Sequence, residues 1–326
     1  MRGRPRPVLW EMLLTVLAYS DFALLAWRLF AMPFLHLNSS AVRGIVSGVA
    51  AAFFWAAAFA GTRHGLNLGF SPADLVVHRF LWSGIAFLPL VIRAGLIDLN
   101  GIRWGRGLAL TILGGAGFAI ISYAGFLLVP LGHGGVIQPS CATLGGLAFA
   151  RILLGEKLPL TRIVGGVIIV CGLVVIGAES VIKIGLHGIT GDCMFVLTGT
   201  MFAAFGTLVR LWRIAPFRAA AVISVLSLLA VRLDWMTGGF DRMVALGWQE
   251  NALQAVLQGV LAGPVALYLC VLSVNLLGPA RAAVFPALVP PFVVLLGLVA
   301  LGEVPSPVQV AGLVIVLFGF WTAQRT

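Results

Sequence analysis

Arg79 has the most distinctive chemistry in the chain, because it lies within an apolar stretch of the sequence, residues 72–93. An arginine inside such a stretch is costly and needs a partner or water. Its guanidinium could hold the carboxylate of a solute through two hydrogen bonds. We favour the alternative, a structural group that pairs with Asp74 or with helix-end carbonyls and extends toward the surface. The neighbouring His78 could carry a proton, although a buried neutral histidine is the expected form.

Neutral polar and aromatic side chains supply the other candidates for a solute-binding pocket. Buried Tyr, Gln and Asn side chains need partners, which come either from another helix or from a ligand. The predicted substrate-binding set is Trp55, Phe59, His78, Arg79, Tyr123, Gln138, Tyr268, Asn275 and Phe285. Pro139 and Pro286 each remove a backbone hydrogen bond within an apolar stretch. Both are therefore predicted as hinges, with fixed kinks as the alternative.

The composition indicates which elements position these residues. Hydrophobic residues make up 60% of the chain and charged residues 10%, and the mean hydropathy is +1.07. Soluble proteins have roughly 25% charged residues, so the solvent around this chain must be lipid. A membrane-spanning helix needs about 20 mostly apolar residues. Ten such helices are predicted, at residues 44–63, 72–93, 107–130, 134–154, 162–180, 192–212, 217–233, 252–276, 281–301 and 307–324.

These stretches exclude several function classes. No segment between them is long enough for a soluble catalytic domain, and no phosphate-binding glycine loop or catalytic motif occurs. We therefore predict that the protein is not an enzyme, has no catalytic residues or cofactor and does not use ATP. The four cysteines lie in apolar stretches without metal-ligand spacing, so no metal site is predicted. The arginines are scattered, which argues against nucleic acid as a partner.

Basic residues predict the orientation in the membrane. If the chain before the first helix is cytoplasmic, eleven basic residues outside that segment fall inside, and only Arg63, Lys183, Arg232 and Arg242 fall outside. We therefore expect a multi-pass protein of the inner (plasma) membrane with both termini cytoplasmic. Residues 1–43 are predicted as an N-terminal arm, either an interfacial helix or an extra segment, because charges interrupt the apolar run at 8–37.

An internal repeat with an offset of 147 residues divides the chain into two halves, 44–180 and 191–324. The dipeptide Gly155-Glu156 matches Gly302-Glu303, and Pro139 matches Pro286. Further matched residues are Gly165, Gly172 and Arg63 with Gly312, Gly319 and Arg210. Each half holds five predicted helices, an odd number, so the second half must cross the membrane in the opposite sense. Such inverted repeats can rock around a shared site and expose it to either side in turn.

Glu156 and Glu303 follow the last apolar residues of matched helices. The inverted topology would place them at opposite membrane edges, about 30 Å apart, so they could not share a substrate. We interpret them as groups near the N-termini of the helices that follow, where negative charge is favourable. None of the predicted spans has an acidic residue near its middle. This disfavours proton-driven export of cationic drugs.

The stretches Pro139–Gly172 (PSCATLGGLAFARILLGEKLPLTRIVGGVIIVCG) and Pro286–Gly319 (PALVPPFVVLLGLVALGEVPSPVQVAGLVIVLFG) resemble the closing halves of two EamA domains. The EamA domain is the five-helix unit of the drug/metabolite transporter superfamily. The opening GIVSGVAAAFFWAAAFAGTRHG and His78-Arg79-Phe80 also fit that family. The resemblance covers about residues 44–324. It implies an all-α integral membrane protein with ten helices in two inverted five-helix repeats, cytoplasmic termini and often export of metabolites.

The leading hypothesis is a secondary transporter that exports small organic metabolites such as amino acids by alternating access. Its partners would be a small-molecule solute and the lipid bilayer, and the protein would be a monomer or a homodimer. A nucleotide-sugar or organophosphate exchanger is an alternative, but such a protein would need several cationic groups in its cavity to bind phosphate. A membrane enzyme acting on lipid would need clustered His or acidic residues at one face. A non-transporting membrane scaffold also remains open.

Overall fold

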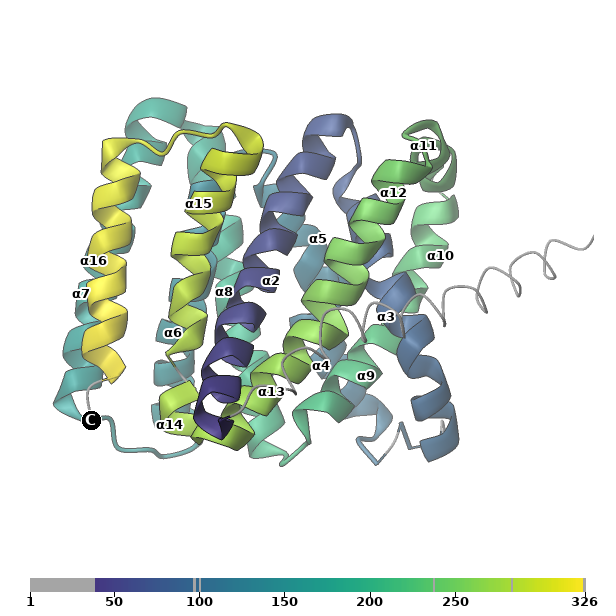
Figure 1. Ribbon diagram of the computed structural model, residues 1–326, viewed down its shortest axis with the longest axis horizontal. Helices are drawn as coiled ribbons and strands as arrows, with labels where there is room; N and C mark the ends of the chain where they lie inside the picture. Colours follow the sequence, from purple (N-terminus) through teal and green to yellow (C-terminus); the bar gives the residue numbers. More distant parts are fainter. Residues whose placement is uncertain (1–38, 96–97, 100, 237, 283, 325–326) are drawn as a thin grey trace, which may run out of the picture.

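The computed structural model describes residues 39–95, 98–99, 101–236, 238–282 and 284–324. The predicted arm therefore lies almost entirely outside the described residues. Ser39 begins the described chain and caps the first described helix, because its hydroxyl oxygen accepts a hydrogen bond from the backbone N–H of Val42. In the described part, the long elements are all helical and lie roughly side by side in one bundle (Figure 1).

The helices follow the apolar stretches closely in order and position. The described helical elements are α2 (Ser40–Leu68), α3 (Pro72–Ala94), α4 (Trp104–Gly114), α5 (Ala116–Gly125), α6 (Leu131–Leu153), α7 (Leu160–Glu179), η2 (Ser180–Ile184), α8 (Leu186–Leu211), α9 (Pro216–Leu226), α10 (Leu228–Met236), α11 (Gly239–Ala245), α12 (Trp248–Gln254), η3 (Ala255–Val265), α13 (Ala266–Leu277), α14 (Pro279–Ala282), η4 (Phe285–Leu288), α15 (Val289–Leu301) and α16 (Pro307–Gln324).

Eight helical stretches within the described residues are long and apolar enough to cross a membrane. They are Ser40–Leu68, Pro72–Arg93, Trp104–Gly125, Leu131–Leu153, Leu160–Ile184, Leu186–Leu211, Trp248–Leu277 and Pro307–Gln324. The ninth predicted helix appears as a shorter apolar segment, Phe285–Leu301. The seventh is divided at Ser227 into α9 and α10.

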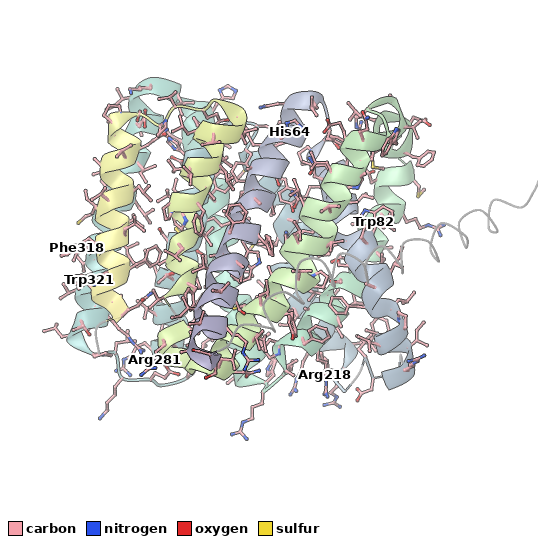
Figure 2. All side chains as sticks on the ribbon, in the orientation of Figure 1. His64, Trp82, Arg218, Arg281, Phe318 and Trp321 are labelled. Carbon is pink, nitrogen blue, oxygen red and sulfur yellow. The ribbon has the colours of Figure 1, made fainter. Side chains whose placement is uncertain are left out.

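Many large apolar side chains lie on the outside of these helices. Val174 of α7 is 65% exposed and Val299 of α15 is 74% exposed. Phe318 and Trp321 point outward from α16 at the edge of the bundle (Figure 2). Arg218 and Arg281 instead lie at the lower end of the bundle in Figure 2, opposite His64. An apolar belt with charges at its ends fits a lipid surround.

Several helices that the sequence predicts as continuous are broken, which corrects those predictions. The third is divided at Gly115, where the backbone leaves helical geometry (φ −100°, ψ −144°). The eighth is kinked at Gly263 (φ −86°, ψ −105°), directly before Pro264. A proline lacks the N–H that continues a helix, and glycine tolerates unusual backbone angles. The two breaks lie at nearly equivalent positions of the repeat.

The predicted pair of hinge prolines behaves asymmetrically. Pro139 lies inside a continuous α6, and its carbonyl accepts a hydrogen bond from the hydroxyl of Thr143 at 3.0 Å. Pro286 lies in the short 3₁₀ turn η4, and α15 begins only at Val289. Pro290 and Pro291 follow at the start of α15, where a missing N–H costs no helical hydrogen bond. Symmetric hinging at the two prolines stays a prediction.

The two ends of the bundle show how the halves are oriented. α2 and α15 end side by side, because Arg63 Nε donates to Glu303 Oε1 at 2.7 Å. α6 begins at this same end, since the backbone N–H of Leu131 donates to Glu303 Oε2 at 2.9 Å. α6 and α8 both end at the opposite end, where Arg210 pairs with Glu156. Repeat-related α2 and α8 therefore run in opposite directions.

Matched glycines pack the last helices of the two halves together. A β-carbon at Gly172 of α7 would lie 2.9 Å from the carbonyl oxygen of Gly312 in α16. One at Gly319 would lie 2.9 Å from the carbonyl oxygen of Gly165. Small residues allow such close helix contact in lipid. The four glycines are the same residues that the repeat matches in pairs.

Replacing Gly172 with valine should destabilise the bundle by about 1–3 kcal/mol, because the new side chain overlaps the backbone of α16. The measurement is thermal unfolding of purified protein in detergent. Gly177→Val is the matched control, because it lies on the same helix with open space around it. Equal melting temperatures for the two variants would contradict the packing described.

Candidate functional site

A buried chain of polar groups connects four helical segments around Arg79. Arg79 Nη1 donates to the hydroxyl oxygen of Tyr123 in α5 at 3.4 Å. The Tyr123 hydroxyl in turn donates to Gln258 Oε1 in η3 at 2.9 Å. The amide of Gln258 donates to Ala58 O at 2.8 Å and to Thr62 Oγ1 at 2.9 Å, both in α2. The network thus crosses from the first half of the chain to the second.

Gln258 and Thr62 belong to this network, and Gln254 lies beside it, but none of the three is in the predicted set. Both glutamines are fully buried, and Gln254 Nε2 donates to Gly61 O at 2.8 Å. A signal existed in the sequence, because the two glutamines are four residues apart in an otherwise apolar stretch. Such spacing places both on one helix face.

Arg79 itself is half-buried, and its guanidinium lies 5.8 Å from the centre of the Phe80 ring. Within the described residues no carboxylate lies within ion-pair distance of it. Among the described residues, the guanidinium makes one hydrogen bond, to Tyr123, and it is long. Most of the donors of the guanidinium therefore have no partner within the part of the chain that the structure describes.

The predicted pairing of Arg79 with Asp74 is wrong. The Asp74 carboxylate instead forms an ion pair with Arg242 of α11. Arg242 Nε lies 2.6 Å from Asp74 Oδ2, and Nη2 lies 2.9 Å from Oδ1. Asp74 is fully buried and also caps α3 through Ser71, so it has no free oxygen for Arg79. The hydrogen bond to Asp74 raises the pKa of Arg242, which stays charged. The bidentate pair attaches the connecting helix α11 to the start of α3.

The broken helices are stabilised by side chains from the other half. Ala116 begins α5 after the break, and its backbone N–H donates to Ser227 Oγ at 3.1 Å. Trp55 Nε1 donates to the carbonyl of Ala262 at 3.2 Å, beside the kink at Gly263. Backbone groups freed inside lipid need such partners. Trp55, predicted as a pocket residue, thus supports the kink.

The remaining predicted residues lie at different distances from the network. His78 is buried and its Nε2 lies 3.0 Å from Asn251 Oδ1. Gln138 Oε1 accepts a hydrogen bond from Oγ of Ser122, the residue directly before Tyr123, at 2.8 Å. Phe59 contacts Phe126, with ring centroids 5.7 Å apart.

Three predicted residues come from the second half. Tyr268 is partly buried in an apolar cluster with Val265 and Leu269. Phe285 packs against Gly48 of α2. Asn275 is exposed, so it lies outside the buried network. Their contact with a solute stays a prediction.

The comparison with protein families decides the identity of the fold. A model described as the EamA-like transporter family matches residues 42–178 and 189–323. The chain belongs to the EamA-like transporter family. The predicted resemblance is therefore confirmed, and so is the prediction that the protein is a transporter rather than an enzyme. The comparison with curated proteins found no match.

A solved structure shares this EamA-like fold. It is described only as a crystal structure of a protein, and it superposes with a TM-score of 0.56 at 18% sequence identity. The similarity covers 86% of this chain and 96% of that chain. At this identity the likeness concerns the fold alone.

The two EamA-like halves are joined by a reciprocal pair of ion pairs. Arg63 of the first half pairs with Glu303 of the second, and Arg210 of the second pairs with Glu156 of the first. Each glutamate follows a glycine with positive φ, Gly155 at 67° and Gly302 at 68°. The structure thus shows each glutamate in contact with the other half, and the role near the N-terminus of the following helix stays a prediction.

The two ion pairs differ in burial. The side chains of Arg63 and Glu303 are 22% and 24% exposed, and Arg63 also donates to the carbonyl of Phe126. Those of Arg210 and Glu156 are 61% and 34% exposed. The pair at the end with Arg63 is therefore less screened by solvent than the pair at the opposite end.

Proposed function

We propose that this EamA-like protein is a secondary transporter that exports small, carboxylate-bearing metabolites such as amino acids by alternating access. The observation that carries the proposal is the reciprocal pair of ion pairs between the halves. One lies at each end of the bundle, so opening one end requires breaking one pair while the other persists. The opposite directions of α2 and α8 support an inverted repeat, which suits such a motion.

Alternating access also needs an anchor for the solute between the halves, and Arg79 is suited to this role. It is a half-buried cation without a carboxylate partner among the described residues. Guanidinium groups bind carboxylates through two parallel hydrogen bonds. Tyr123 and Gln258 place neutral polar atoms beside it, which fits a zwitterionic or neutral solute better than a phosphorylated one.

We further propose ten membrane crossings, with α9–α10 and η4–α15 completing the eight longer spans. Arg210, Arg218 and Arg281 lie at the end of the bundle assigned to the cytoplasm, in line with the positive-inside rule (Figure 2). The other end, with Arg63 and Glu303, would face outward. The membrane would be the inner (plasma) membrane.

Reconstitution into liposomes tests the proposal. We expect purified protein to exchange labelled amino acids across the membrane without ATP, and empty liposomes to show only leakage. Amide analogues that lack the carboxylate should compete poorly. Absence of exchange for every member of a broad solute panel would favour a membrane scaffold. Preference for nucleotide sugars would favour the exchanger alternative.

A further inference from the structure

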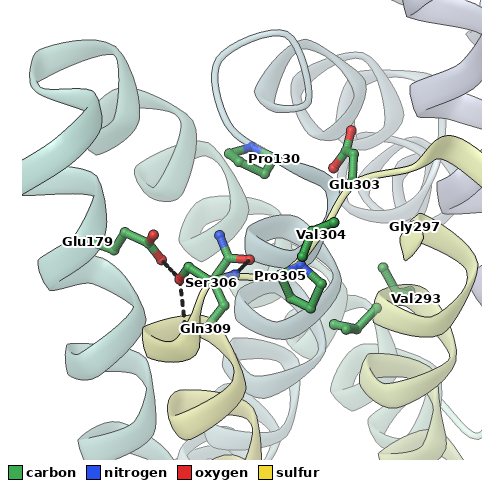
Figure 3. Close-up of a pocket in the computed structure, with 11 residues that line it drawn as sticks. Pro130, Glu179, Val293, Gly297, Glu303, Val304, Pro305, Ser306 and Gln309 are labelled. Atoms are coloured by element: carbon green, nitrogen blue, oxygen red, sulfur yellow. Dashed lines mark hydrogen bonds between the residues drawn. The ribbon is translucent and has the colours of Figure 1, made fainter.

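A cavity of about 210 Å³ lies between the two halves at the end of the bundle that carries the Arg63–Glu303 pair. Glu179, Ser306, Gln309 and Glu303 provide its polar walls (Figure 3). Water occupies about 30 Å³ per molecule in the liquid, so this polar space can hold several waters. The cavity is separate from the network around Arg79.

Behind Glu179 lies a histidine that the proposed transport mechanism does not use. His133 of α6 is fully buried. Its Nδ1 lies 3.1 Å from Asp192 Oδ1 of α8, and its Nε2 lies 3.9 Å from Glu179 Oε2 of α7. Nε2 has no hydrogen-bond partner among the described residues. Asp192 and Glu179 are themselves 9% and 7% exposed.

The surrounding hydrogen bonds determine which ring nitrogen carries the proton in the neutral form. Ser180 Oγ donates to Asp192 Oδ2 and lies 3.2 Å from His133 Nδ1. Both oxygens near Nδ1 are therefore acceptors, so Nδ1 is the protonated nitrogen. The lone pair of Nε2 then faces the carboxylate of Glu179. At 3.9 Å the two atoms are too far apart for a hydrogen bond, but an imidazolium here would attract the carboxylate.

The charges around His133 do not balance when its ring is neutral. Asp192 and Glu179 bring two negative charges, and Lys183 brings one positive charge, 3.0 Å from Glu179 Oε1. Across the cavity, Arg63 and Glu303 neutralise each other. One added proton on His133 makes the cluster neutral. Buried charge is costly unless it is balanced.

We infer that His133, held between Asp192 and Glu179, is a proton-binding site that opens onto the cavity and holds this end of the bundle closed when occupied. A proton that enters from the outer solution through cavity water binds Glu179 and passes to His133 Nε2, leaving a carboxylate and an imidazolium. The imidazolium on α6 then attracts carboxylates on α7 and α8. Ser306 Oγ, at the start of α16, donates to Glu179 at 2.7 Å, so α16 is connected to the same cluster.

The site has no counterpart at the repeat-related positions. At the repeat offset of 147, His133 corresponds to Ala280 and Asp192 to Ile45, so the second half cannot form a counterpart. Under the proposed orientation, the site responds to the pH on the outer side. Its effect on transport rests on the proposed function, whereas proton binding itself does not.

The test measures proton binding and transport separately. Nitrogen NMR of the full chain with labelled histidine should show a His133 imidazole that becomes doubly protonated between about pH 8 and about pH 5. Its signals are assigned by their loss in His133→Gln. Glu179→Gln keeps the histidine and should leave less imidazolium at the same pH. A His133 ring that stays neutral over this range overturns the inference, whether or not solute is transported.

In liposomes, export should be about fivefold or more faster at outer pH 8 than at outer pH 5. His133→Gln should abolish this difference, while His187→Gln, an exposed histidine on α8, should preserve it. A pH difference that survives in His133→Gln contradicts the proposed closure. If no solute is exchanged, the proposed transport function is wrong. The NMR titration would still show whether His133 binds a proton.

Discussion

Substitution of Arg79 by glutamine should reduce transport of a carboxylate-bearing solute by about 30-fold or more. The change removes a half-buried cation that has no carboxylate partner within the described chain. Removing one partner of a desolvated, hydrogen-bonded charge pair costs about 2 kcal/mol or more, which corresponds to that factor. The measurement is initial exchange rate against solute concentration in liposomes, and the loss should appear mainly in the apparent affinity.

Three further variants make the Arg79 experiment specific. Arg79→Lys keeps the charge but not the paired donors, so it should recover only part of the activity. Tyr123→Phe removes the hydroxyl that contacts both Arg79 and Gln258, and we expect a smaller loss. Arg93→Gln, at an exposed position on the same helix, should behave as the unmodified protein. An unchanged affinity in Arg79→Gln would remove Arg79 from the site.

Breaking the Arg63–Glu303 pair should open the end of the bundle that it closes. Glu303→Gln removes a charge-assisted hydrogen bond from Arg63 and weakens the bond from Leu131 N–H. Hydrogen bonds to charged groups contribute about 1.5–3 kcal/mol, so the closed arrangement should lose roughly 2 kcal/mol. A cysteine placed at Val294, in the wall of the cavity, should then react with a thiol reagent about 30-fold faster.

The repeat itself supplies the control for this experiment. Glu156→Gln breaks the equivalent pair at the other end, where the partners are 34% and 61% exposed. Exposed ion pairs contribute about 0–1 kcal/mol, so labelling of the Val294 cysteine should not change. The native cysteines are replaced beforehand, so that the cysteine at position 294 is the thiol that is labelled. Similar labelling rates for the two glutamate variants would contradict the idea that Arg63 and Glu303 close this end.

The glycine positions illustrate what a repeat in the sequence can predict. Gly165, Gly172, Gly312 and Gly319 are matched in pairs by the offset, and the structure packs them against one another between α7 and α16. Gly155 and Gly302 are matched likewise, and both adopt positive φ before their glutamates. Backbone requirements of this kind depend on local geometry, so they recur wherever the local sequence recurs.

The partners of charged side chains could not be predicted from the local sequence in this way. The sequence suggested that Arg79 pairs with Asp74, five residues away, yet Asp74 binds Arg242, 168 residues away. Glu156 and Glu303 were placed with their own following helices, yet each pairs with an arginine of the other half. Long side chains select partners from whatever the tertiary structure brings near. Proximity along the chain is a weak guide to that choice.

The sequence by itself determined the membrane environment, the order of the helices, the repeat and the family, because these depend on composition and periodicity that each segment carries locally. Only the tertiary structure decided where helices break, which polar residues meet and where a cavity remains. Gln258, His133 and Ser227 acquire their roles from neighbours in other helices. Such contacts arise from packing of distant segments, which no local pattern records.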